Sequence, residues 1–222
     1  MIVYGIFVFR VAAVPNAQGV AEACAQLLAS SLDLSSFSFF QRSTAGEILT
    51  FGNRQCAALA RPQERSVVLI QNGAKCHVFS PPGAAGPQDA RLTLCVTTDG
   101  EYPQRVAFSL AAKAWDVYRA QALPALPPCP RACAAMPADI NAQLPALRDL
   151  VAQYQDPVKA DPITSMQKEL DETKAVLTEA MDELIKRGGS LEELVDKSES
   201  LSFQSKAFMK QSKDMNSCCT LL

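Results

Sequence analysis

The chain has 222 residues and a formal net charge of -2, with 20% charged and 48% hydrophobic residues. This length suits one medium domain with an additional segment, and the composition is that of a protein that can bury a core. The nearly neutral charge gives no basis for nucleic-acid binding, which needs a basic surface. No run approaches the roughly 18 apolar residues of a membrane-spanning helix.

The first residues, MIVYGIFVFRVAAV, are strongly apolar. They lack a basic leading region and carry Arg10 in their middle. Their β-branched and aromatic residues are spaced as in a strand. We therefore interpret them as a first β-strand rather than a secretory leader, and expect the protein in the cytosol.

Residues 1–140 alternate between strand and helix patterns, which predicts a small α/β or α+β domain. Runs rich in Val, Ile, Phe and Leu predict strands over Ile2–Val14, Ser66–Ile70, Cys76–Ser80 and Arg91–Thr97. The segment Val20–Leu28 fits a strand and a helix equally well. Helical spacing predicts helices over Phe39–Ala60, Glu101–Gln121 and Leu144–Tyr154, and Pro and Gly content predicts loops at 81–90 and 123–139.

The eight cysteines form no recognisable disulfide or metal framework. Four scattered ones are expected to be buried as small hydrophobes: Cys24, Cys56, Cys76 and Cys95. The pair Cys129 and Cys133 lacks the second pair that a zinc site needs, so we interpret it as surface-loop thiols.

The pattern of the chain changes after the Asp161-Pro162 dipeptide. Apolar and small residues then recur in alternating steps of three and four, which predicts a heptad seam: Ile163, Met166, Leu170, Thr173, Leu177, Ala180, Leu184, Arg187, Leu191, Leu194, Ser198, Leu201, Ser205, Phe208, Ser212 and Met215. The period alone also fits a plain coiled coil, or an amphipathic helix packed on the first domain.

Two features favour a more specific assembly. Arg187 occupies the centre of the seam, where a buried guanidinium is costly unless several acceptors meet it. Gly188 and Gly189 follow, and each lowers helix propensity by roughly 1 kcal/mol relative to Ala. The helix should therefore be weak alone and form on assembly with partners.

The chain ends in NSCCTLL. Cys219 and the three residues after it fit the C-a-a-X prenylation signal, and a final Leu favours geranylgeranyl over farnesyl. Cys218 offers a second site, for palmitate, and stable anchoring requires two lipid signals. The plainer alternative is an unmodified, reactive cysteine pair.

Several short stretches extend the pattern into a resemblance. They are SSFSFFQRS (35–43), EYPQRVAF (101–108), YQDPVKADP (154–162), ELDETK (169–174), SKAF (205–208) and NSCC (216–219). Together with the central arginine, they resemble the prenylated longin-domain R-SNAREs, synaptobrevin homologues without a transmembrane helix. The chain departs from that family in the composition of loops 81–90 and 123–139, in Gly189, and in its final Leu.

The resemblance implies an α+β fold. Residues 1–140 would form a longin domain, which is profilin-like, with a five-stranded antiparallel sheet carrying one helix on one face and two on the other. Residues 141–162 would form a short helix and linker, 163–216 the R-SNARE motif, and 217–222 the lipidation tail.

The resemblance also implies a function in ER–Golgi and other vesicle transport. The R-helix would combine with three Q-SNARE helices in a parallel four-helix bundle that drives membrane fusion, with Arg187 meeting three glutamine carbonyls. Reversible lipidation would let the protein cycle between the cytosol and the cytosolic faces of Golgi, endosomal and vesicle membranes.

A chain with a lipid and an apolar stripe needs shelter in water. We expect a closed state in which residues 163–215 wrap the longin domain and the prenyl chain lies in an apolar groove beside Phe51, which fits ordinary core about equally well. Three seam serines are candidate phosphorylation sites, since a phosphate there would enter a helical core: Ser198, Ser205 and Ser212.

An enzyme is the main alternative, and the sequence gives it little support. There is no phosphate-binding GxxxxGK[ST] loop and no HExxH motif, and the only histidine, His77, should point away from its neighbour Cys76 on a strand. We expect no catalytic residue, metal or cofactor; a longin-assisted acyl transfer has no identifiable residues here. A tether without fusion activity is the second alternative, and it would have no use for Arg187.

Overall fold

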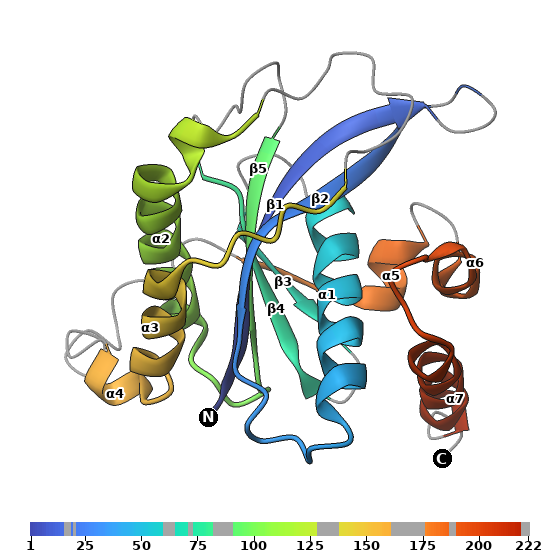
Figure 1. Cartoon of the computed structure of the whole chain (residues 1–222). Coiled ribbons are helices and arrows are strands. Elements are labelled where there is room, and N and C mark those ends of the chain that lie inside the picture. Colours follow the sequence, from blue (N-terminus) through green and yellow to red (C-terminus); the bar gives the residue numbers. More distant parts are fainter. Residues whose placement is uncertain are drawn as a thin grey trace.

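The computed structural model of the chain describes residues 1–15, 19, 21–59, 65–70, 73–81, 91–127, 138–160, 176–186 and 190–218, with side chains up to residue 211. Within these residues lie one six-stranded sheet and seven α-helices, so the α+β class is as predicted. Figure 1 shows helices on both faces of the sheet.

The sheet has the spatial order β2-β1-β5-β4-β3-β6. The strands are β1 (Val3–Pro15), β2 (Ala21–Leu32), β3 (Arg65–Leu69), β4 (Lys75–Phe79), β5 (Arg91–Thr98) and β6 (Leu177–Ala180). The first five strands pair antiparallel, as the longin resemblance implied. The sixth comes from the predicted SNARE motif and pairs parallel to β3, so the complete sheet is mixed.

Strand β1 lies in the middle of the sheet between β2 and β5. Residues Ile6–Phe9 are all fully buried, because helices cover both faces, and this explains a continuous apolar run rather than an alternating one. Gly5 is required by close packing, since a Cβ there would lie 2.8 Å from the carbonyl oxygen of Ser31 on β2.

Arg10, the one charged residue of β1, is buried among oxygen acceptors. Arg10 is 1% exposed; its Nε and Nη2 donate to Gln26 Oε1, and its Nη1 donates to the carbonyl oxygen of Pro127. Oxygen acceptors thus satisfy the guanidinium inside the domain.

The helices are α1 (Arg42–Leu59), α2 (Gln104–Gln121), α3 (Pro145–Gln153), α4 (Pro157–Ala160), α5 (Met181–Ile185), α6 (Leu191–Lys197) and α7 (Phe203–Cys218), with a 3-10 turn η3 (Leu123–Ala125). One hydrophobic cluster joins the sheet to α2 and α3, and the other joins it to α1 and α5–α7. The predicted arrangement of one longin helix on one face and two on the other is therefore correct (Figure 1).

The predicted strands and helices of the first domain all form, with boundaries shifted by a few residues. Of the ambiguous segment Val20–Leu28, residues 21–28 belong to strand β2, and Val20 lies outside the described residues. The loop predicted at 123–139 begins with the 3-10 turn η3. Residues 82–90 and 128–137, including Cys129 and Cys133, lie outside the described part of the chain.

Candidate functional site: the contact of residues 176–211 with the first domain

The C-terminal segment does not form one long helix in this structure. Its described part forms β6, α5, α6 and α7, which follow one another along α1 and the β3 edge of the sheet (Figure 1). Serines start the two later helices: the Ser190 hydroxyl accepts from the Glu193 N–H (3.2 Å), and the Ser202 hydroxyl accepts from the Ser205 N–H (3.3 Å). Each of these two helices therefore has its own N-terminal cap and is a separate element.

Backbone pairing attaches the start of the segment to the sheet. Strand β6 pairs with β3 from Ser66↔Leu177 to Leu69↔Ala180. This covers the edge of β3, whose N–H and C=O groups would otherwise be open for pairing. A heptad pattern does not predict this strand, because the pairing depends on a free sheet edge far away in the sequence.

Apolar packing attaches the three helices. Six of their side chains are buried in one cluster with α1 and the sheet, and so is Leu201 in the link between α6 and α7; the six are Met181, Leu184, Ile185, Leu191, Val195 and Met209. The cluster includes Phe51 of α1, which is 2% exposed. Next to it, a Cβ on Gly52 would lie 3.4 Å from Met181 Cε, so α1 and α5 are in direct contact.

Phe51 takes the core role, one of the two that the sequence left open. It is a buried residue of α1, and the same cluster contains residues of the sheet and of the C-terminal segment. No lipid is present, so the expected prenyl groove beside Phe51 stays a prediction.

A carboxylate fixes α7 to α1. Glu47 Oε2 accepts hydrogen bonds from the N–H of Ser202 (2.8 Å) and from the hydroxyl of Ser205 (2.7 Å), which is 0% exposed. The Ser202 N–H, with a smaller contribution from the Ser205 hydroxyl, holds the pKa of Glu47 below its ordinary value. Ser205, a predicted phosphorylation site, thus faces a negative charge in this conformation.

The predicted seam is only partly buried here. Leu184, Leu191, Leu201 and Ser205 are buried. Leu194 and Ser198 are half-buried, and the Ser198 hydroxyl lies 3.0 Å from that of Ser200. Leu177 is 46% exposed and Phe208 is 47% exposed.

Four buried apolar residues lie off the seam: Met181, Ile185, Val195 and Met209. The heptad pattern does not include them, although apolar residues beside a seam indicate that a second face of the helix packs against another surface. The contact with the first domain therefore uses a face that only overlaps the predicted seam.

Other predicted residues fall outside the description. Ile163, Met166, Leu170, Arg187 and Cys219 lie in undescribed parts of the chain. The backbone of α7 includes three more, whose side chains are not described: Ser212, Met215 and Cys218.

Beneath α1 lies a group of buried thiols. Cys56, Cys76 and Cys95 are buried as predicted, whereas Cys24 near the end of the β1–β2 hairpin is half-buried. Asn53 Oδ1 accepts from the Cys76 thiol (3.1 Å) and from Thr97 Oγ1 (2.9 Å). Burial raises the pKa of Cys76 well above its ordinary value, so this thiol is held in its unreactive, protonated form.

His77 faces the opposite side of the sheet from Cys76. Its ring is 0% exposed, lies edge-on to Phe108 at 5.5 Å between ring centroids, and places Nε2 3.1 Å from Thr98 Oγ1. Burial, with a smaller contribution from Lys75, lowers the pKa of His77 to about 4. A neutral, enclosed imidazole fits a structural role.

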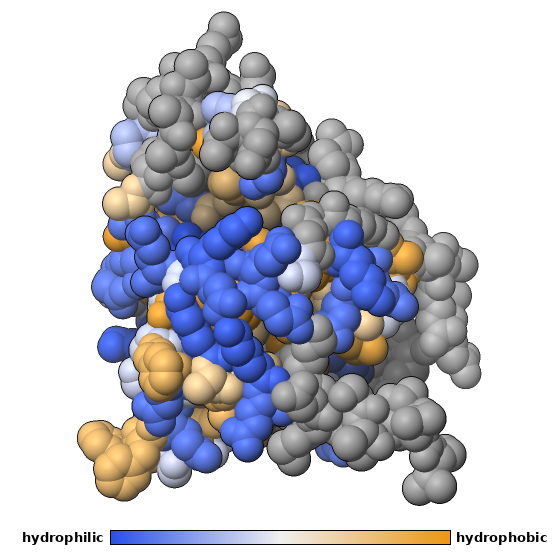
Figure 2. All heavy atoms as spheres, turned by 90° about the vertical axis from the view of Figure 1, so that its right-hand side faces the viewer, coloured by the Kyte–Doolittle hydropathy of each residue, from blue (hydrophilic) through white to orange (hydrophobic). Residues whose placement is uncertain are grey.

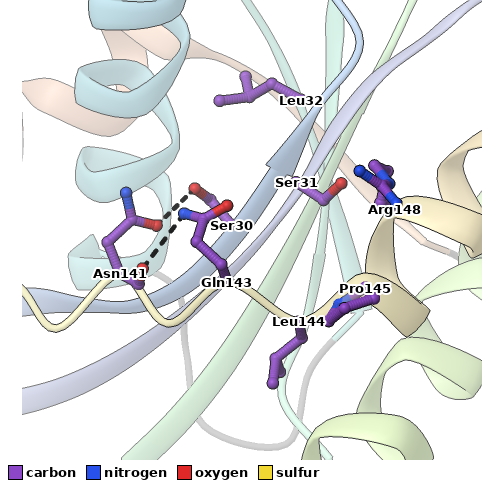
Figure 3. A pocket seen from close by; sticks show the side chains of 8 residues that line it. All are labelled: Ser30, Ser31, Leu32, Asn141, Gln143, Leu144, Pro145 and Arg148. Atoms are coloured by element: carbon purple, nitrogen blue, oxygen red, sulfur yellow. Dashed lines mark hydrogen bonds between the residues drawn. The ribbon is translucent and has the colours of Figure 1, made fainter.

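A pocket of about 350 Å³ with a mixed polar and apolar lining lies at the other edge of the sheet, beside β2 (Figure 3). The Ser30 hydroxyl donates to Asn141 Oδ1 (2.8 Å), Gln143 Nε2 donates to the Asn141 carbonyl oxygen (3.3 Å), and Arg148 lies at the far end from Asn141. Its lining side chains offer hydroxyl, amide and guanidinium groups, but none is a base that could activate a serine. The pocket takes no part in the α1–α7 contact.

A search of the described residues for a helix long and apolar enough to cross a membrane found none. The same residues contain no group of three or more His, Cys, Asp or Glu side chains arranged to hold a metal ion.

Comparison with known proteins identifies the family. Residues 162–220 match the synaptobrevin family model. The synaptobrevin homologue YKT6 of Yarrowia lipolytica is 40% identical over 197 residues, and that of Schizosaccharomyces pombe is 38% identical over 196; each alignment covers 88% of this chain and 91% of the relative. The VAMP-like protein YKT61 of Arabidopsis thaliana is 34% identical over 198 residues, which are 88% of this chain and 90% of the relative. The chain belongs to the family of YKT6-type synaptobrevin homologues.

Proposed function

We propose that the chain is an R-SNARE of intracellular vesicle fusion, in which residues 163–216 form a parallel four-helix bundle with three Q-SNARE helices. The observation that carries the proposal is the synaptobrevin match over residues 162–220, because it covers the whole heptad seam. Arg187 would sit at the centre of the bundle, where glutamine carbonyls satisfy its five donors without a second charge.

The contact with the first domain would inhibit assembly. Leu184, Leu191, Leu201 and Ser205 belong to the seam, and all four are buried here against α1 and its neighbours. A side chain cannot pack in this contact and in a four-helix bundle at once. The described conformation would therefore be the closed, resting form of the protein, which releases the SNARE motif before it meets Q-SNAREs.

The C-terminal cysteines would provide the membrane anchor. Cys219 would carry an isoprenoid and Cys218 a palmitate, and loss of the palmitate would leave an anchor too weak to hold the protein on a membrane. The protein would then cycle between the cytosol and the cytosolic faces of Golgi, endosomal and vesicle membranes. It would act without catalysis, cofactor or metal.

Assembly tests the first part of the proposal. Wild-type chain and an Arg187→Glu variant are mixed with the three helices of a Q-SNARE set, and the SDS-resistant complex is measured together with fusion of liposomes. Arg187→Glu should block fusion, because a carboxylate would face glutamine carbonyls in the core. Arg187→Gln, the matched control, should have a milder effect. Equal fusion by wild type and Arg187→Glu would refute the proposed position of Arg187 at the centre of the bundle.

Fractionation of cells tests the anchor separately. Cys219→Ser should leave the protein wholly cytosolic, whereas Cys218→Ser should retain weak, reversible binding through one chain. Mass spectrometry of the C-terminal peptide identifies the lipid on each cysteine. Full membrane retention of Cys219→Ser would contradict the proposed prenylation.

A further inference from the structure

Three phenylalanine side chains are almost completely exposed. Phe39 is 79% exposed, Phe40 is 87% exposed and Phe203 is 89% exposed, values that are unusual for large apolar rings in a folded chain. Phe39 and Phe40 form an edge-to-face pair with ring centroids 5.6 Å apart. We call these three side chains the aromatic tip.

Contacts place the three rings at the same end of the molecule. Ser202, next to Phe203, donates its N–H to Glu47, which lies in the second turn of α1. Arg42 begins α1, about 7.5 Å along the helix axis from Glu47, and Phe40 is two residues before it. Figure 1 shows the loop before α1 and helix α7 in the same lower part of the molecule, and Figure 2 shows apolar side chains projecting at a lower corner of an otherwise largely hydrophilic face.

The loop that carries Phe39 and Phe40 is held in place. The N–H and hydroxyl of Ser38 both donate to Gln41 Oε1, and Arg42 Nε donates to the carbonyl oxygen of Phe37. The Phe37 ring is half-buried and packs 5.5 Å from Tyr4 of β1. One aromatic residue thus fixes the base of the loop, and the next two are left projecting from it.

Neither state of the SNARE motif covers the aromatic tip. In the described conformation the rings are exposed, although α7 lies against α1. In a bundle, Phe203 would still face outward, because it lies between the seam positions Leu201 and Ser205. Phe39 and Phe40 belong to the first domain and have no position in the bundle.

We propose that the aromatic tip inserts into the interfacial region of a phospholipid bilayer, and so binds the closed protein directly to membranes. Projecting rings on a short loop and a helix end form a convex apolar surface, which a deformable lipid interface can surround. The choice of a membrane over a protein partner rests on the proposed function and on the end of α7, which lies in the same lower part of the molecule as the loop before α1 (Figure 1). A lipid on Cys218 or Cys219 would bring a bilayer close to the loop that carries Phe39 and Phe40, whereas Phe203 starts α7, about 22 Å from Cys218 along the helix. Insertion would add a weak, protein-based attachment to the lipid anchor. Alone it would bind the unlipidated chain to an excess of vesicles but would not retain it on membranes during cell fractionation.

Vesicle flotation of the full chain tests the proposal without any attached lipid. The background is Cys218→Ser/Cys219→Ser, and the probe is an excess of phosphatidylcholine vesicles, with and without phosphatidylserine. Changing Phe39, Phe40 and Phe203 to Ser should lower the partition coefficient about tenfold for each ring that inserts. All three are exposed, so the variant should fold normally, and its thermal melting provides the check.

A matched triple variant provides the control. Val158, Ile140 and Leu69 are exposed apolar residues of other elements, with exposures of 70%, 44% and 42%. Changing these three to Ser should leave vesicle binding unchanged. Equal losses in both triple variants, or no vesicle binding by the background protein, would overturn the proposal.

Fluorescence locates the rings directly. In a Phe40→Trp variant, brominated phospholipids should quench the tryptophan fluorescence more than they do in the parent chain, whose tryptophan is Trp115. Absence of this quenching, or a dimer that depends on the three rings and forms without vesicles, would overturn the proposal. Assembly with Q-SNARE helices should be unaffected by the triple Ser variant, so a failure of assembly in every variant concerns the proposed function and not the aromatic tip.

Discussion

Removing the Glu47 carboxylate should release α7 from the first domain. In the structure this group accepts hydrogen bonds from the Ser202 N–H at 2.8 Å and the Ser205 hydroxyl at 2.7 Å. Hydrogen bonds to a charged group contribute roughly 1.5–3 kcal/mol each. Water can replace the partner of exposed Ser202 but reaches buried Ser205 less easily, so Glu47→Ala should destabilise the contact by about 2 kcal/mol. That energy corresponds to an equilibrium constant for opening of the contact that is about thirtyfold larger.

Hydrogen exchange of the full chain measures this opening. Backbone amides of α6 and α7 should exchange about thirtyfold faster in Glu47→Ala, while those of β1 and β5 should keep their protection. Glu47→Gln keeps an acceptor oxygen but loses the charge, so its exchange rates in α6 and α7 should lie between those of wild type and Glu47→Ala. Glu199→Ala removes an exposed carboxylate close to α7 and is the matched control. Unchanged exchange of α7 in Glu47→Ala would refute the assigned role.

Lowering the pH tests the same contact between Glu47 and the start of α7. The pKa of Glu47 is lowered from its ordinary value of 4.5, chiefly by the Ser202 N–H. Its contribution is therefore complete above pH 4.5 and disappears as the pH falls through the folded-state pKa. Wild-type α7 should lose protection in that range, and Glu47→Ala should show no further loss from this group.

Four further substitutions have distinct expected outcomes. Burial lowers the pKa of His77 from 6.5 to about 4, so on acidification the unfolded chain takes up a proton before the folded chain does. The free energy of unfolding should therefore fall by about 3 kcal/mol as the pH drops from 6.5 to 4. His77→Gln should make the melting temperature less dependent on pH in this range. Phe51→Glu buries an unpaired charge and should increase proteolysis near residues 156–190 and shift the lipidated protein to membranes; an unaltered digestion pattern would contradict this. Ile185→Ser should open the closed form and leave the stability of the bundle unchanged, whereas Phe208→Ser should weaken the bundle more than the closed form. Hydrogen exchange measures the opening of the closed form, and thermal melting measures the stability of the bundle.

Much of the first domain was predictable because its sequence patterns are local. The apolar run of β1 and the helical spacing of α2 each identify one element without knowledge of the rest. Val20–Leu28 could not be assigned from its own residues, because its alanines favour a helix. Pairing with β1 places residues 21–28 in a strand. The resemblance supplied the antiparallel sheet, and no local pattern contained that information.

The candidate site was predictable only in part. Leu184, Leu191 and Leu201 of the predicted seam are buried here against the first domain, while their packing in a bundle stays a prediction. The heptad pattern did not indicate that Met181 and Val195 would be buried too, since that depends on the surface that α1 presents. Nor did it contain the Glu47–Ser205 hydrogen bond, which joins residues 158 positions apart in the sequence.

One segment can specify two structures because its local preferences are weak and its apolar residues are abundant. Isolated helices as short as α5 and α6 are marginal in water, so tertiary contacts decide the conformation. Against the first domain, the segment gains burial of off-seam residues such as Ile185 and the Glu47 hydrogen bonds. In a bundle it would instead gain burial of Leu177 and Phe208, which are nearly half exposed here. The equilibrium between the two states should therefore respond to residues on either face, and residues common to both, such as Leu184, should shift it least.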